Sequence, residues 1–315
     1  MAALTLVLIP LIGAIFLFLY RGNARFTSLA ALKVAIASLL VLLASLTCWT
    51  TPEMRQFSVP WLNSLGSSFS LKMDGLGMVL CMLNSVVYFL LFLYLQKKEI
   101  SRPYAFFGWL LLAQAGMNGV FLATDSLLFY FFWELALIPM YFLASQWGGA
   151  RRIAVTFKFF VYTFLGSVLM LVGILYLQSK TADHSFSIES FRMLRLTADQ
   201  QSWLFWLFFL SFAIKLPVFP LHTWQPDAYE ESPTPVTAVL SAVMVKMGIL
   251  GLLRWLLPLL PIASYMWGDV VMSLAVAGII YGSLLAMRQT DLKRLVAYSS
   301  IAHIGLLTAG VFALN

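Results

Sequence analysis

Long, uninterrupted apolar segments constrain the fold of this chain more than any other feature. A helix needs about 20 mostly apolar residues to cross the hydrocarbon core of a bilayer. Ten segments qualify, at 3–20, 27–48, 76–96, 104–123, 126–146, 154–177, 202–222, 234–257, 266–287 and 295–313. The sequence therefore predicts an all-α integral membrane protein with about ten transmembrane helices.

The composition excludes several other classes of protein. Of the 315 residues, 61% are hydrophobic and 10% are charged, whereas about 25% are charged in an ordinary soluble domain. This excludes a soluble enzyme and a disordered chain. Cys48 and Cys81 are too few for a disulfide scaffold, and we interpret both as buried small side chains. No metal-ligand spacing and no glycine-rich phosphate loop is present, so no metal or cofactor is predicted.

The basic residues indicate the surroundings and the orientation of the chain. The net charge of +7 comes from single bases between apolar segments, which predicts a lipid bilayer and no nucleic acid as partner. Odd-numbered connections hold twelve Lys and Arg, and even-numbered ones hold six. The positive-inside rule then places the N-terminus outside, with Met1–Tyr20 retained as the first span. The seventh connection disagrees, because it carries Asp227, Glu230 and Glu231 and no base.

Glu134, Lys215 and Lys246 stand deep inside apolar segments, where a charge is costly and usually marks an ion path. Lys246 lies 12 residues into its segment, about 18 Å along a helix and near the middle of a bilayer. We interpret it as a proton carrier. Glu134 needs a basic partner, and Lys215 is the base available at similar depth. The alternative for these residues is a static ion pair that only holds helices together.

The segment from Lys215 to His222 predicts a broken helix. Pro217 and Pro220 cannot donate hydrogen bonds to the preceding turn. Broken backbone at membrane depth lines hydrated cavities in ion-coupled transporters, although a simple kink is the alternative. His222 and His303 are candidate proton relays, against a structural role. The aromatic side chains of 203–212 are expected to face lipid.

Three motifs resemble one family of membrane proteins. KLPVFPLHTWQPDAYEESPTP at 215–235, followed by Lys246, and DLKRLVAYSSIAH at 291–303 resemble the proton-translocating antiporter-like subunits of respiratory complex I. FWELALIPMYFL at 132–143 looks most like the subunit M branch of that family. The resemblance extends from about residue 70 to the end of the chain and is looser before it.

The resemblance implies a fold built from inverted five-helix repeats. It divides the chain into N-terminal helices at 1–103, a first repeat at 104–257 and the first two helices of a second repeat at 258–315. The second broken helix of the family is not found before Asn315, so the sequence looks truncated or split. We therefore expect this chain not to move protons by itself.

The resemblance also implies a function. It matches Glu134 and Lys215 to the buried charge pair of the family, Lys246 to its central lysine, and His222 and His303 to polar residues of its hydrated axis. The expected function is proton translocation in NADH:quinone oxidoreductase, driven by quinone reduction elsewhere, with no redox centre in this chain. Expected partners are the other membrane-arm subunits, in a bacterial plasma membrane. The alternatives are a subunit of a sodium/proton antiporter or membrane-bound hydrogenase, and a non-conducting structural remnant.

Overall fold

The computed structural model describes residues 1–20, 23–47 and 55–313. Within these ranges, nine helices are long and apolar enough to cross a membrane. This confirms the all-α membrane class, whereas the count of ten helices is not confirmed. The chain divides into two compact units, Met1–Leu143 (unit 1) and Ala144–Asn315 (unit 2). This division does not test the predicted repeat boundaries, which stay a prediction.

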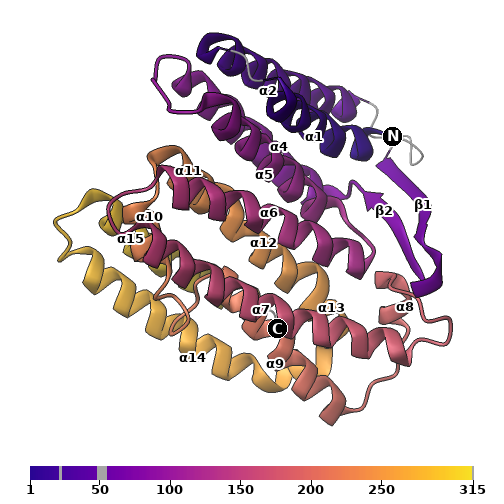
Figure 1. The fold of residues 1–315 in the computed structure, drawn as a ribbon. Coiled ribbons are helices and arrows are strands. Elements are labelled where there is room, and N and C mark those ends of the chain that lie inside the picture. The colour runs from indigo at the N-terminus through magenta and orange to yellow at the C-terminus, as the bar shows by residue number, and fades with distance from the viewer. Residues whose placement is uncertain (21–22, 48–54, 314–315) are drawn as a thin grey trace. The chain divides into compact units, whose positions relative to one another are not determined.

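Unit 1 is a helical bundle with one hairpin (Figure 1). Its helices are α1 (Ala2–Leu19), α2 (Ala24–Thr47), α4 (Gly75–Leu95), α5 (Pro103–Leu122) and most of α6 (Ser126–Trp147). Helix α1 packs along α5 and α2, and α4 packs against α2 and α5. Cys81 of α4 is buried as expected, while Cys48 lies outside the described residues.

A buried amide repairs a gap in α1. Pro10 lies inside that helix and has no N–H, so the carbonyl of Leu6 loses its helical donor. The Asn118 Nδ2 of α5 donates to this carbonyl oxygen at 2.8 Å. Asn84 Nδ2 of α4 in turn donates to Asn118 Oδ1 at 2.8 Å. Because buried polar groups require partners, these contacts fix the register of three helices.

A β-hairpin, which the sequence did not predict, occupies part of the connection at 49–75. Strand β1 (Gln56–Leu62) pairs antiparallel with β2 (Ser67–Lys72), and Gly66 at φ 79° turns the chain between them. Asp125, at the start of α6, accepts hydrogen bonds from Ser67 Oγ at 2.9 Å and Ser68 N at 3.0 Å. The same carboxylate caps α6 through Leu127 N and Leu128 N, both at 3.0 Å. Burial raises the pKa of Asp125, and these hydrogen bonds oppose part of that shift.

Unit 2 packs its helices around a central one. It contains α7 (Arg152–Lys180), α8 (Ile188–Arg192), α9 (Ala198–Lys215), α10 (Gln225–Glu231), α11 (Thr234–Val239), α12 (Val245–Leu250), α13 (Leu257–Leu259), α14 (Pro261–Ala286) and α15 (Leu292–Phe312). Helices α7, α12 and α14 all contact α9. Phe205, Phe208, Phe209 and Phe212 of α9 are therefore buried, and the expectation that this aromatic segment faces lipid is wrong for them.

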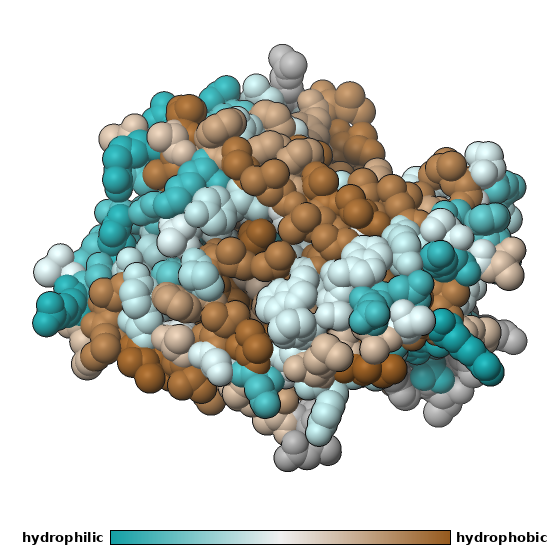
Figure 2. Space-filling view, turned by 90° about the horizontal axis from the view of Figure 1, so that it is seen from below, coloured by the Kyte–Doolittle hydropathy of each residue, from teal (hydrophilic) through white to brown (hydrophobic). Residues whose placement is uncertain are grey.

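Other faces of the helices remain apolar and exposed. Figure 2 shows hydrophobic surface over much of one face of the molecule. On α14, for example, Tyr265 is 92% exposed, and Ile280 and Leu284 are more than half exposed. Apolar surface of this extent is typical of a chain surrounded by lipid or by partner subunits.

Candidate functional site

The helix that carries Lys215 breaks where the sequence predicts. Helix α9 ends at Lys215, turns occupy 216–224, and α10 begins at Gln225. The predicted span at 202–222 is thus helical only to Lys215. Two carbonyls near the break find new donors, since Val218 N donates to Ala213 O and Trp224 Nε1 donates to Ile214 O, both at 2.9 Å. These two backbone carbonyls therefore keep hydrogen-bond partners although the helix is broken.

Lys246 lies between two distortions of its helix that the sequence does not predict. The predicted span at 234–257 contains π-helical segments at Leu240–Met244 and Gly251–Leu256, and α12 between them carries Lys246. Its side chain is half-buried, and Nζ donates to the carbonyl oxygen of Ser241 at 2.8 Å. Single π-turns inside α-helices are frequent at functional sites.

Two glycines bring the helix of Lys246 onto the last turn of α9. A Cβ atom at Gly248 would lie 2.6 Å from Leu216 Cγ and 2.9 Å from Phe212 O. A Cβ at Gly251 would lie 2.5 Å from the Phe212 ring. Only glycine permits this approach. The helix of Lys246 thus packs directly against the turn that carries Lys215, whose side chain is 2% exposed.

The two predicted histidines have different surroundings. His222 is buried between the rings of Phe219 and Tyr281, at centroid distances of 5.5 and 5.0 Å. Its Nδ1 is buried and makes no hydrogen bond within the described part of the chain. His303, in contrast, is exposed on α15, on the same face as the exposed Leu306 and Leu307. Their roles as proton relays stay predictions.

Glu134 belongs to unit 1, in the middle of α6. It is half-buried, and its helix packs closely against α5. A Cβ at Gly116 of α5 would lie 2.8 Å from the backbone N of Ala136, and one at Gly119 would overlap the Phe132 ring. The glycines of α5 therefore position the turn of α6 that carries Glu134. The lysines belong to unit 2, so the pairing of Glu134 with Lys215 stays a prediction.

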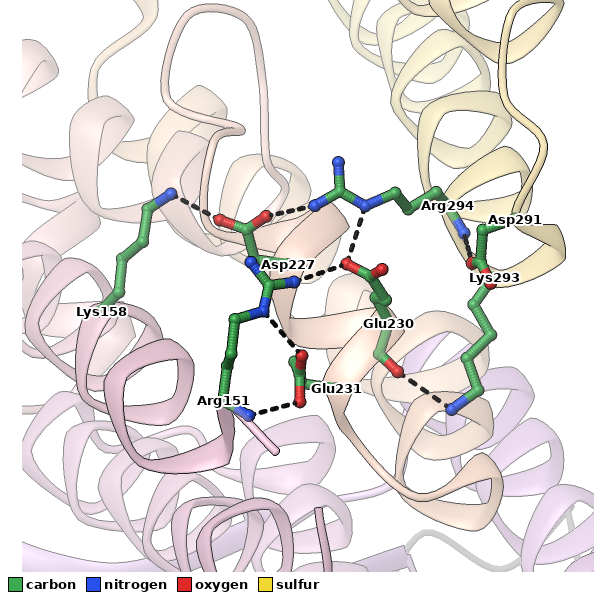
Figure 3. A network of polar contacts seen from close by, with 8 residues as sticks. All are labelled: Arg151, Lys158, Asp227, Glu230, Glu231, Asp291, Lys293 and Arg294. Atoms are coloured by element: carbon green, nitrogen blue, oxygen red, sulfur yellow. Dashed lines mark hydrogen bonds and ion pairs between the residues drawn. The ribbon is translucent and has the colours of Figure 1, made fainter. Parts of the chain in front are cut away.

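An ion-pair network lies next to the broken helix, and the sequence analysis missed it (Figure 3). Asp227 pairs with Lys158 and with Arg294, both at 2.9 Å. Glu230 pairs with Arg294 at 2.8 Å and with Arg151 at 3.0 Å. Arg151 also pairs with Glu231 at 3.0 Å. The three acids of α10 thus bind bases that precede or belong to α7 and α15.

The network explains why the seventh connection carries acids and no base, unlike the other odd-numbered connections. The acids of the seventh connection pair with bases of the fifth and ninth, so these three odd-numbered connections lie at one end of unit 2. Lys293 Nζ strengthens this end by donating to the carbonyls of Ser232 at 2.7 Å and Glu230 at 3.2 Å. A cluster of acids in the seventh connection, with no base beside it, was the sequence feature that could have predicted this network.

The network also fixes the segment that follows the break. The pairs are partly exposed, so each contributes only about 0.2–1 kcal/mol alone, and the gain comes from their connection. A second tie lies beneath them, because Gln225 Nε2 donates to Tyr229 Oη at 2.8 Å and to Ser300 Oγ of α15 at 3.4 Å. Burial raises the pKa of the Tyr229 phenol, which therefore stays neutral. Helix α10 is held between α7 and α15 from both sides.

Comparisons of the sequence with known proteins found a matching family and close relatives. The family model described as NADH:quinone oxidoreductase/Mrp antiporter, TM, matches residues 123–315. The chain is 36% identical to NADH-quinone oxidoreductase subunit M of Rickettsia typhi, covering 98% of this chain and 64% of the relative. It is 37% identical to F(420)H(2) dehydrogenase subunit M of Methanosarcina mazei, covering 97% and 63%.

Solved structures give the same result. A chain of respiratory complex I from Thermus thermophilus with bound NADH superposes with a TM-score of 0.89 at 29% identity, over 99% of this chain and 65% of that chain. The Mrp complex from Dietzia sp. matches with a TM-score of 0.87 at 22% identity, over 100% of this chain and 34% of that chain, which shows the fold alone. The chain thus spans 63–64% of the length of these curated relatives.

Proposed function

The chain belongs to the NADH:quinone oxidoreductase/Mrp antiporter transmembrane family, and from this premise we propose that it translocates protons as a membrane subunit of an NADH:quinone oxidoreductase. The observation that carries the proposal is the position of Lys246. Its amine lies half-buried between two π-helical segments, on a helix packed against the turn of Lys215. An ammonium inside an apolar helical bundle is held at a cost, which suits it to release and rebind a proton.

The residues have the following roles in this proposal. Lys246 carries the proton, and its amine uses the Ser241 carbonyl as its resting partner. Glu134 and Lys215 form a switching pair, in which a longer separation frees the Lys215 charge to repel the proton on Lys246. His222 and His303 pass protons toward and away from this centre. Helix α10, held by its ion pairs, keeps the break beside Lys215 in place.

The energy source lies outside this chain. Electron transfer from NADH to quinone takes place in other subunits, and this chain contributes no redox centre. Its partners are the other membrane subunits of the complex, and its location is the bacterial plasma membrane. The relatives named NADH-quinone oxidoreductase subunit M, at 36% identity, support this proposal over a separate sodium/proton antiporter, because the solved Mrp complex matches at 22% identity and shows the fold alone.

Substitution of Lys246 tests the proposal in the assembled complex. We expect Lys246→Ala to abolish proton pumping while the subunits still assemble, because no other group replaces the amine. The control is Lys72→Ala, which removes an exposed lysine at the end of β2. Proton pumping, NADH oxidation and subunit content are measured on the same membranes. Pumping at the wild-type rate by an assembled Lys246→Ala complex would overturn the proposal.

A further inference from the structure

A cavity of about 450 Å³ opens at one end of unit 1. It lies where α2 and α5 begin and α4 ends. Its lining has three kinds of side chain: the bases Arg25 and Lys98, the polar Ser28 and Gln96, and the apolar Leu29 and Ile100 among others. Among the described residues no acid lines it, although the exposed Glu99 stands between the lining residues Lys98 and Ile100 in the sequence.

The cavity has a positive electrostatic character. Arg25 and Lys98 are exposed, and neither forms an ion pair within the described ranges, although Lys98 Nζ lies 5.4 Å from the centre of the Tyr94 ring. The N-terminal ends of α2 and α5 reach the lining at Ala24 and Pro103. Helix N-termini carry partial positive charge and favour anions. The Phe26 N–H of α2 is already bonded to Asn23 Oδ1, and Pro103 has no N–H, so the two bases supply most of the positive charge.

The floor of the cavity is already formed. Gln96 Nε2 of α4 donates to the carbonyl of Ser28 in α2 at 2.8 Å and to that of Phe92 at 3.1 Å. Ser28 Oγ lies 3.3 Å from Gln96 Oε1 and donates to it. These contacts join α2 to α4 and satisfy the polar floor. The exposed Arg25 and Lys98 remain available to bind an anion.

The walls near the cavity are apolar. Leu29 in the lining is 42% exposed, and Phe26 on α2 is 41% exposed. On α4, Leu90, Leu93 and Tyr94 are each more than half exposed. Aromatic and basic residues together at the end of apolar helices are typical of the interface between the hydrocarbon core and the headgroups. A ligand that satisfies both features has an anionic head and apolar chains.

We propose that this cavity binds the phosphate group of an anionic phospholipid, whose acyl chains lie along the exposed faces of α2 and α4. A free phosphate ion would use the two bases and make no contact with the apolar wall. Basic pockets between transmembrane helices are suited to anionic headgroups. The bound lipid would therefore be retained when the protein is extracted from the membrane.

The experiment measures lipid retention on the purified chain. The protein is reconstituted in nanodiscs of phosphatidylcholine with phosphatidylglycerol, extracted with detergent, and examined by native mass spectrometry. We expect wild type to retain phosphatidylglycerol preferentially. Each base near an anionic surface strengthens binding of an anionic lipid by a similar factor. The double variant Arg25→Gln with Lys98→Gln should therefore lower retention about 10-fold to 30-fold. Arg288→Gln, which removes an exposed base of unit 2, should retain the lipid as wild type does.

Two further measurements separate the possible outcomes. Leu29→Trp keeps both charges and narrows the apolar side of the cavity, so it should also lower retention if the acyl chains bind there. Inorganic phosphate added in excess should displace no more lipid than sodium chloride at the same ionic strength. Equal retention of phosphatidylglycerol by wild type and the double variant, or no preference over phosphatidylcholine, would overturn the proposal. Complete displacement by inorganic phosphate would overturn the lipid as the ligand. Raising salt should weaken retention by wild type, a test that needs no variant.

Discussion

Replacing Gly248 by alanine should displace the helix that carries Lys246. The new Cβ would lie 2.6 Å from Leu216 Cγ and 2.9 Å from the carbonyl oxygen of Phe212. Ordinary contacts between carbon atoms are about 3.5–4.0 Å, so relief requires a shift of about 1 Å. The Phe212 carbonyl accepts a helical hydrogen bond from Leu216 N at 2.8 Å and is held in place. The movement therefore falls on α12.

The magnitude follows from this overlap. Overpacking of this size costs about 1–3 kcal/mol, offset by up to about 1 kcal/mol because alanine favours a helix more than glycine does. The larger effect should be functional, since a shift of about 1 Å in a reacting group can cost about 100-fold in rate. We therefore expect Gly248→Ala to fold and assemble and to pump protons about 10-fold to 100-fold more slowly.

The chain offers a matched control. A Cβ at Gly268, in α14, meets nothing within 4 Å, so Gly268→Ala makes the same chemical change without the overlap. Proton pumping by the assembled complex and thermal unfolding are measured for both variants. If Gly248→Ala pumps protons and unfolds as Gly268→Ala does, the close packing of α12 on α9 is not what positions Lys246.

Four further changes test other parts of the structure. Asp125→Ala removes the acceptor for Ser68 N, Leu127 N and Leu128 N. The loss of about 3 kcal/mol of hydrogen bonding should speed hydrogen exchange of these amides about 100-fold. The control Asp269→Ala should leave their exchange unchanged, and the same result for Asp125→Ala would contradict this role. Asp227→Asn and Arg294→Gln should each loosen α10 by about 1 kcal/mol, and the double variant should lose less than the sum; strict additivity in hydrogen exchange would show that the two are not coupled. Glu134→Asp should retain partial proton pumping and Glu134→Ala should lose most of it, so wild-type pumping by Glu134→Ala would leave the pair with Lys215 at most structural. A cysteine at Ala2 should react with an impermeant thiol reagent from outside the cell, and labelling only from the cytoplasmic side would reverse the predicted orientation.

Features that depend on local cost could be predicted from the sequence. A bilayer requires long apolar helices, and nine of them stand close to the predicted positions. Pro217 and Pro220 have no N–H, so the break after Lys215 follows from their chemistry wherever the helix lies. A charge inside an apolar segment is costly in any arrangement. The sequence alone therefore predicted Glu134, Lys215 and Lys246 as candidate site residues.

Features that depend on which elements are neighbours required the tertiary structure. Lipid is as apolar as a protein core, so hydropathy cannot tell a buried face from a lipid-facing one. For this reason the sequence did not predict that the phenylalanines of α9 are buried. Nor did it predict that His303, in the apolar helix α15, is exposed.

Partners distant in sequence were hidden in the same way. Asp227 meets Lys158 and Arg294, and Asn118 reaches the carbonyl that Pro10 leaves open, only because of how the helices pack. The sequence by itself determined which groups are costly in a membrane, because that cost is set residue by residue. Only the tertiary structure decided which groups offset that cost, because hydrogen bonds and ion pairs depend on distance between atoms rather than on position in the chain.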